Sequence, residues 1–183
     1  MRFLSQKGAM FGLDARITLA IFSGLSVVAG AVGYGYMSKT QVTAVVTELT
    51  NVSKAYINFQ LDTQVDTETF TDLLDRDGGQ IGWNGPYLTM SSDDHLAYGK
   101  YNLLYGIDMN KVKGSKPRPC LNKKDLCFVW VQLTDVPSKL ALQVDEAVDG
   151  SNGGEGTPDS GNLLVNNDLS TDRAVISYKL TRK

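Results

Sequence analysis

The sequence has very little of the residues on which catalysis and metal binding usually depend. It contains one histidine and two cysteines among 183 residues. His95 lies in the polar stretch DDHLAYG, which predicts a surface residue rather than a catalytic base. Asp93 and Asp94 are adjacent, so their side chains are expected to point apart in an extended chain. No phosphate-binding loop or nucleophile elbow occurs. We therefore expect no enzymatic activity, no nucleotide site and no organic cofactor.

Neither sign of charge is in large excess, because 18 basic and 20 acidic side chains give a formal net charge of −2. Loss of Arg2 and Lys7 would leave 16 basic against 20 acidic side chains, a charge of −4. A negative balance disfavours sequence-independent binding to DNA. One basic cluster could contact an anionic surface, but without interleaved aromatic residues a solvated loop is the simpler interpretation, and we do not expect nucleic acid as a partner. The cluster comprises Lys111, Lys113, Lys116, Arg118, Lys123 and Lys124.

One long segment has no charged residue at all. Ile17 to Met37 is about 21 residues, or roughly 30 Å of helix, which matches the hydrocarbon thickness of a bilayer. Asp14 lies at its start, and an acid at the mouth of a membrane helix is costly without a positive partner. Arg16 is two positions away, on a different helix face. The sequence therefore predicts a membrane helix whose acid finds its partner on another molecule.

The residues before this segment indicate its orientation and processing. Arg2 and Lys7 make the leader positive, which predicts a cytoplasmic leader with everything after Lys39 across the membrane. The small pair Gly8-Ala9 precedes the apolar run, so a cut there would keep the hydrophobic helix, unlike an ordinary secretory signal.

Small residues are interleaved through the apolar segment, and they allow close packing of helix backbones in a membrane. A plain anchor of weak helix propensity is the alternative. The small residues are Ala20, Ser23, Gly24, Ser26, Ala29, Gly30, Ala31, Gly33 and Gly35.

A one-sided apolar pattern continues beyond the membrane segment. Apolar residues recur there at steps of three and four, the spacing of one helix face. Neither proline nor glycine interrupts the chain from Tyr36 to Thr63. We expect one helix from about Leu13 to about Leu61, with a globular domain packed on its second half. The apolar face comprises Val42, Val45, Val46, Leu49, Val52, Tyr56 and Phe59.

The N-terminal region resembles the type IV pilins and the related type II secretion pseudopilins. The resemblance is carried by Lys7-Gly8-Ala9 and by the run Met10-Phe11-Gly12-Leu13-Asp14. A cut after Ala9 makes Met10 the first mature residue and places Asp14 fifth, where the family has its acid. The family usually has Gly before the cut, Phe after it and Glu fifth, so this chain differs at three positions. A second similarity is the stretch GWNGPYL from Gly82 to Leu88, which is similar to a turn of many pseudopilins.

The resemblance implies a prepilin peptidase that removes residues 1–9 and methylates Met10. It implies a pairing of Asp14 with the amino group of a neighbour's Met10, and an α+β, pilin-like fold in which the long helix packs on an antiparallel sheet. The membrane and filament-core helix would then be residues 10–38, and the amphipathic half of the helix would be residues 39–62. The periplasmic or extracellular domain would be residues 63–183. The subunit would cross the inner membrane once before an assembly platform and its ATPase build a helical homo-oligomeric filament.

Three functions stay open at this point. The first is a type IV pilus subunit at the cell surface, and the second is a pseudopilin in a periplasmic pseudopilus. The third, of another class, is a periplasmic binding module that keeps its membrane anchor. The stretch from Gly82 to Leu88 favours the pseudopilin, and the cysteine pair favours the pilus.

The part after the long helix has the pattern of a small sheet domain. Three segments are rich in aromatic and β-branched residues and are expected to be strands, namely Leu96–Tyr105, Phe128–Thr134 and Ala174–Leu180. The second is almost continuously apolar, which predicts burial on both faces. Pro137–Val148 is expected to be a helix. The Gly82–Leu88 stretch reads as a turn whose aromatic residues cover the junction of helix and sheet.

Cys120 and Cys127 are the only cysteines. Outside the reducing cytoplasm, such a pair is most simply a disulfide, and two free thiols are the alternative. A metal site needs more ligands than these two cysteines and a distant His95.

An oxygen-rich stretch between Asp145 and Gly161 is a candidate calcium site, because hard cations prefer carboxylate and amide oxygens. It does not match the twelve-residue calcium loop, since Gly150 follows Asp149 directly. A flexible solvated loop is the alternative interpretation. The candidate ligands are Asp145, Asp149, Asn152, Glu155 and Asp159.

Overall fold

The structure is a computed structural model that describes residues 8–75, 79–107, 120, 126–150, 161–168 and 171–182. Side chains are described throughout these ranges except at residues 8–11, 13, 34 and 35. The chain divides into two compact units, Met1–Thr40 and Gln41–Lys183, which we describe separately. The basic cluster between Lys111 and Lys124 lies outside the described residues.

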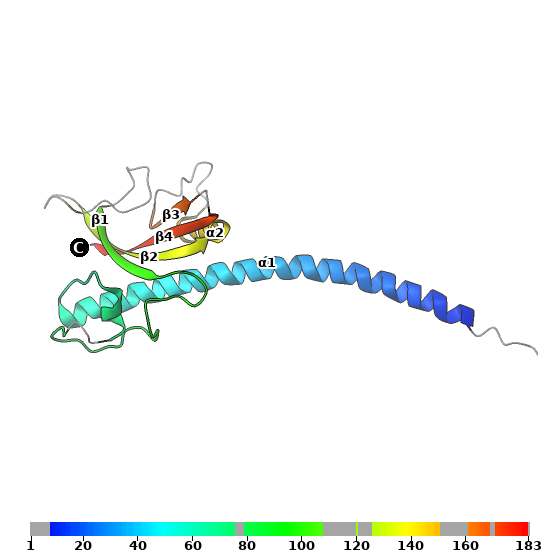
Figure 1. The fold of residues 1–183 in the computed structure, drawn as a ribbon, viewed down its shortest axis with the longest axis horizontal. Coiled ribbons are helices and arrows are strands. Elements are labelled where there is room, and N and C mark those ends of the chain that lie inside the picture. Colours follow the sequence, from blue (N-terminus) through cyan, green and yellow to red (C-terminus); the bar gives the residue numbers. More distant parts are fainter. Residues whose placement is uncertain are drawn as a thin grey trace, which may run out of the picture. The chain divides into compact units, whose positions relative to one another are not determined.

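Helix α1 runs from Gly8 to Thr63, 56 residues without a break (Figure 1). The sequence predicts this single long helix with ends a few residues further in. In the first unit, every described residue from Gly12 to Met37 is exposed. Within the described part of the chain, α1 is the one helix long and apolar enough to cross a membrane.

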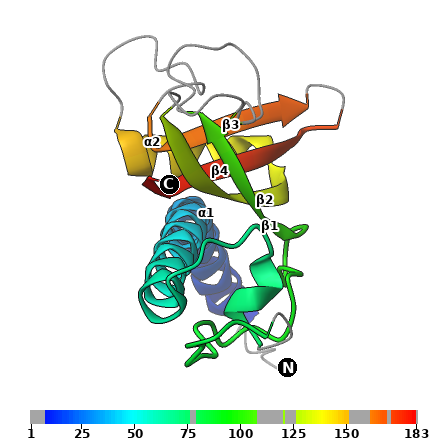
Figure 2. The same cartoon turned by 90° about the vertical axis from the view of Figure 1, so that its left-hand side faces the viewer.

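The second unit contains a four-stranded antiparallel sheet in the order β1-β2-β4-β3. Its strands are β1 (Tyr101–Ile107), β2 (Cys127–Pro137), β3 (Leu163–Asp168) and β4 (Arg173–Arg182). Figure 2 shows this sheet lying over the second half of α1. The α+β class with an antiparallel sheet is therefore confirmed.

The strand predictions differ from the structure in two places. The first predicted strand begins too early, because residues 96–99 form a turn closed by the His95 amide donating to the Gly99 carbonyl at 2.8 Å. Strand β3 was not predicted at all. It is short, and Asn166 and Asn167 weaken its strand pattern. It forms through its register with β4, in which Val165 lies opposite Ile176.

Helix α2 runs from Ser138 to Asp149 and begins after Pro137, close to the predicted bounds. Its buried face holds Leu140, Ala141 and Val144. It ends at Gly150, whose φ of 79° lies in the region that glycine adopts most easily.

The main core lies between α1 and the sheet. Val45, Leu49 and Phe59 from α1 share one cluster with Val129, Val131 and Leu133 from β2. Trp130 faces the other side of β2 and is fully buried with Leu164. The predicted burial of this strand on both faces is thus confirmed.

Candidate functional sites: the membrane helix, the aromatic turn and a cavity beside helix α1

Asp14 lies in the exposed, apolar part of α1. Its backbone carbonyl accepts a hydrogen bond from Thr18 Oγ1 at 2.7 Å. Among the described residues no ion pair involves Asp14, and Arg16 is equally exposed. The partner on another molecule that the sequence predicts for this carboxylate stays a prediction.

The residues of the predicted processing site begin the helix. Gly8, Ala9 and Met10 have helical backbone at the start of α1, and their side chains are outside the description. Cleavage and methylation at this place stay predictions.

The small residues of the first unit leave open space around the helix. A methyl group added to Gly24, Gly30 or Gly33 would meet no atom within 4 Å. The isolated chain therefore makes no use of these glycines, while a second helix could approach closely at them.

The aromatic turn from Gly82 to Leu88 lies against the end of α1. Trp83 Nε1 donates to the Asp72 carbonyl at 2.9 Å, and the Tyr87 hydroxyl donates to Asp62 Oδ2 at 2.9 Å. The Tyr87 ring meets Phe59 and Trp83 edge to face at 5.8 and 5.7 Å. These contacts fix the loop after α1, as the sequence predicts for a structural turn.

A short 3-10 helix, η1 (Phe70–Leu73), connects this turn to the core. Its Asp72 carboxylate is buried and accepts from the Thr67 hydroxyl at 2.5 Å and from Gln80 Nε2 at 3.0 Å. The Phe70 ring stacks on Tyr101 at 5.0 Å. The loop before the turn is therefore anchored to β1 and held together by the buried Asp72.

A cavity of about 680 Å³ lies in the second unit between α1 and residues 87–96. Its walls mix apolar and polar groups, including Val52, Met90, Asn51 and Lys54. The lining also includes Glu48, His95 and Tyr101. A partly apolar space with a few convergent titratable side chains has the general character of a binding site.

His95 is the centre of a hydrogen-bonded cluster, which corrects its predicted place at the surface. Its side chain is only 10% exposed, and Nε2 lies 2.8 Å from Glu48 Oε2. The same carboxylate oxygen accepts from the Tyr101 hydroxyl at 2.9 Å. The imidazole also stacks on the Tyr98 ring at 4.5 Å.

The electrostatics of this cluster keep both tyrosines neutral. Burial, reinforced by the Glu48 carboxylate, raises the pKa of Tyr101 well above its ordinary range. The same two causes raise the pKa of Tyr98. Each phenol is therefore a hydrogen-bond donor in the physiological range rather than an acid.

Asp93 and Asp94 do not point apart as predicted. Both reach Lys100, whose Nζ lies 3.4 Å from Asp93 Oδ2 and 3.2 Å from Asp94 Oδ1. The cause is a β-bridge between Asp94 and Lys100, which folds the segment back on itself. The hydrogen bond to Asp94 and the charges of both carboxylates raise the pKa of Lys100.

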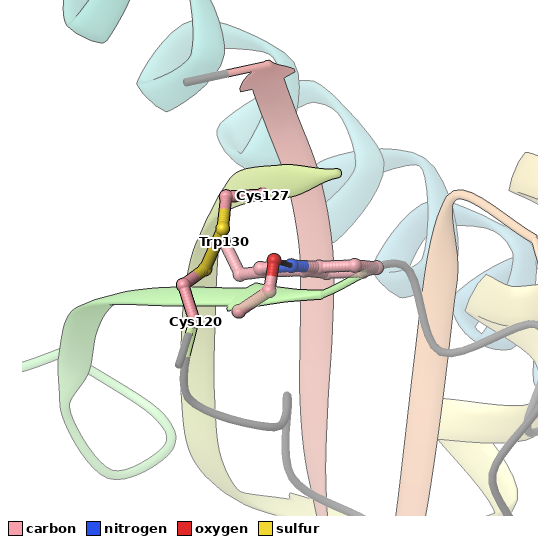
Figure 3. Close-up of a disulfide and its surroundings, with 4 residues drawn as sticks. Cys120, Cys127 and Trp130 are labelled. Atoms are coloured by element: carbon pink, nitrogen blue, oxygen red, sulfur yellow. Dashed lines mark hydrogen bonds between the residues drawn. A yellow bond between two sulfur atoms is a disulfide. The ribbon is translucent and has the colours of Figure 1, made fainter. Parts of the chain in front are cut away.

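Cys120 and Cys127 form the predicted disulfide at the start of β2 (Figure 3). On the same strand, Trp130 Nε1 donates to the Gly106 carbonyl of β1 at 3.4 Å. Lys179 Nζ lies 4.7 Å above the Phe128 ring and 5.3 Å from the Trp130 ring. The disulfide thus ties Cys120 to the first residue of β2, beside the aromatic residues of that strand.

Two of the five candidate calcium ligands are described. Both oxygens of Asp149 accept backbone hydrogen bonds, from Asn162 at 2.9 Å and from Leu163 at 2.8 Å. Asp145 Oδ1 is buried without a hydrogen-bond partner in the described part of the chain. Asn152, Glu155 and Asp159 lie outside the described residues, and no group of three metal-binding side chains occurs within them. Asp149 therefore has a structural role in closing the loop, and the calcium site stays a prediction.

The cluster of Glu48, His95 and Tyr101 could not be found from local patterns. Glu48 lies on the polar edge of the α1 face, 47 positions before His95. The only sequence signal for the burial of this cluster is the spacing of Glu48 from Val45 and Val52, which places Glu48 beside the buried apolar face of α1.

The comparisons with known proteins leave the family undecided. No protein-family model, no curated protein and no solved structure matches this chain.

Proposed function

We propose that this chain is a structural subunit that polymerises through its N-terminal helix into a type IV pilus filament. The observation that carries the proposal is an exposed, charge-free helix surface preceded by one acid, Asp14, that has no partner among the described residues. A buried charge is tolerated in an apolar setting only if it meets an opposite charge. The free amino group of a neighbouring Met10, produced by cleavage after Ala9, would supply that charge.

The geometry of the first unit supports close helix contacts. Gly24, Gly30 and Gly33 have open space around them, and van der Waals packing at small residues is a main source of helix association in membranes. The second unit is a separate compact body, held together by its own core. In the proposed filament, this second unit forms the folded domain of each subunit.

Processing gives the first test. The mature protein should begin with an N-methylated Met10 when it is analysed by mass spectrometry after expression with a prepilin peptidase. A mature chain that still begins with Met1 would remove the amino group on which assembly depends and would overturn the proposal.

The acid gives the second test. Asp14→Asn should insert into the membrane normally but form few or no filaments, because the amide cannot neutralise a neighbouring ammonium group. Asp14→Glu keeps the charge and should assemble well. Carbonate extraction measures insertion, and electron microscopy of sheared fractions measures filaments. Normal filaments from Asp14→Asn would contradict the mechanism.

A periplasmic pseudopilus is the second candidate. It is favoured by the Gly82–Leu88 stretch, in which Trp83 and Tyr87 anchor the loop after α1. Both candidates use the same helix, so the Asp14 variants do not separate them. Filaments found at the cell surface under normal expression favour the pilus, whereas polymer confined to the periplasm favours the pseudopilus.

A further inference from the structure

The chain's only histidine controls the shape of a turn. His95 Nδ1 accepts two backbone hydrogen bonds, from the amides of Ala97 and Tyr98, each at 3.0 Å. The His95 amide donates to the Gly99 carbonyl at 2.8 Å and closes the same turn. A ring nitrogen can accept hydrogen bonds from these amides only if it is unprotonated and carries a free lone pair.

The two contacts of the ring fix its protonation state. A neutral imidazole has one donor and one acceptor nitrogen. Because Nδ1 faces two N–H groups, it must be the acceptor, so the proton lies on Nε2. Nε2 then donates to Glu48 Oε2 at 2.8 Å, which links the turn to α1. The tautomer is thus assigned from the hydrogen-bond partners.

Protonation would break one of these links and keep the other. An imidazolium ring is a donor at both nitrogens, so a proton on Nδ1 would face the Ala97 and Tyr98 amides with no acceptor between them. The contact of Nε2 with Glu48 would gain charge and persist. The ring would therefore stay on α1 while the backbone of residues 96–99 moves away from it.

We propose that His95 couples ambient pH to the conformation of the turn from Leu96 to Gly99. The turn forms with neutral His95 and opens when Nδ1 takes a proton. Leu96 and His95 both line the cavity beside α1, and Leu96 is fully exposed. Acid therefore changes the rim of that cavity. All of these groups lie in the second unit, so the inference does not depend on filament assembly.

Titratable groups from three elements face His95. Glu48 comes from α1, Tyr101 from β1 and Tyr98 from the turn itself. Both phenols have raised pKa values. Two further charges, Asp94 and Lys54, line the same cavity. Carboxylates and amines ordinarily titrate outside pH 5 to 8, whereas imidazole titrates inside it.

The experiment uses nuclear magnetic resonance on the full chain in detergent micelles. Since the sequence has one histidine, ring ¹⁵N labelling gives a single set of signals. Amide labels on alanine and tyrosine report Ala97 and Tyr98, which are assigned by the loss of their signals in Ala97→Ser and Tyr98→Phe. At pH 8 the ring should be the Nε2–H tautomer. Between pH 8 and 5 both amide signals should move with the midpoint of the ring.

Two variants serve as matched controls. In His95→Asn the side-chain oxygen takes the place of Nδ1 and accepts the same two amides, but it does not titrate. The amide signals should then stay constant with pH. Glu48→Gln leaves the Nδ1 contacts intact, so the pH response of both amides should persist.

Three results would overturn the proposal. They are an Nδ1–H tautomer at pH 8, amide signals that stay fixed while the ring titrates, or the same amide response in His95→Asn. The first is measured on the unmodified chain alone and decides the question even if a variant fails to fold.

Discussion

Gly82 shows how a single backbone conformation holds the loop after α1 in place. Its φ is 88°, and a methyl group added there would collide with the carbonyl oxygen of Asp62 near the end of the helix. Other residues pay about 1–2 kcal/mol for a left-handed conformation, before any clash is counted. The aromatic turn therefore depends on glycine at this position.

We expect Gly82→Ala to lower the free energy of unfolding by about 3 kcal/mol, the sum of backbone strain and a clash with rigid main chain. Gly79→Ala is the control, because φ there is 63° but no atom lies within 4 Å. It should cost only about 1 kcal/mol. Urea unfolding in detergent measures both. Equal losses would show that the contact with Asp62 has no energetic role.

Asp145 makes stability depend on pH. Burial, with a smaller contribution from the Asp149 carboxylate, raises the pKa of Asp145 from 3.8 to about 6. The folded state thus binds this proton more tightly than the unfolded chain. The resulting stabilisation is complete below about pH 4 and is lost as the pH rises through about 6.

We expect Asp145→Asn to raise the free energy of unfolding at pH 7 and to have little effect at pH 4. The full shift corresponds to about 3 kcal/mol, and solvent screening of this half-buried group reduces the gain to about 1 kcal/mol. Thermal unfolding at the two pH values measures it. Asp149→Ala is the contrasting variant, because it removes acceptors for two backbone amides and should destabilise at both. A gain for Asp145→Asn at pH 4 equal to that at pH 7 would contradict the assignment.

At the scale of elements, the disulfide ties the segment before β2 to the first residue of that strand. It closes a loop of about eight residues, which the chain-entropy relation values at about 2.5 kcal/mol. Cys120→Ser with Cys127→Ser should therefore lower the unfolding free energy by about that amount. A reductant should lower the stability of the unmodified chain to the same level and leave the double variant unchanged. A response of the double variant to reductant would show that the effect has another source.

The sequence predicts those elements whose own pattern is strong. Helix α1 has a long apolar segment followed by a regular stripe, and β2 is almost wholly apolar, so each is recognisable without its neighbours. Strand β3 has no such pattern. It becomes a strand through its six-residue antiparallel pairing with β4, the next strand along the chain, rather than through a pattern of its own.

The candidate site was less predictable than the fold, because Glu48 and His95 are 47 positions apart in the sequence. The polar neighbours of His95 indicate a surface loop, whereas its burial comes from Glu48 on α1 and Tyr101 on β1. The sequence around His95 indicates neither contact. Asp14, by contrast, stands out because it is a lone acid before an apolar run.

At the scale of the whole molecule, the two units use apolar residues in opposite ways. In the second unit α1 buries its stripe, with Leu49 and Phe59 at 1% and 0% exposed. In the first unit the apolar residues are exposed, for example Phe22 at 67% and Val27 at 73%. A membrane or a filament of identical helices would cover this surface, and the proposed function has the chain pass from one to the other.

Gly30 distinguishes a membrane anchor from a filament core. A Cβ added there has no other part of the chain within 4 Å, so Gly30→Leu should keep membrane insertion and stabilise the helix by up to about 0.8 kcal/mol. If helices pack closely at this glycine, the same change should reduce filament yield on the order of tenfold, equivalent to about 1.4 kcal/mol per contact. Val32→Leu, at a position already occupied by a branched side chain, is the matched control and should assemble normally. Sheared-filament yield and carbonate extraction, measured on both variants, separate assembly from insertion. Filament yield unchanged by Gly30→Leu would mean that the small residues serve only the anchor.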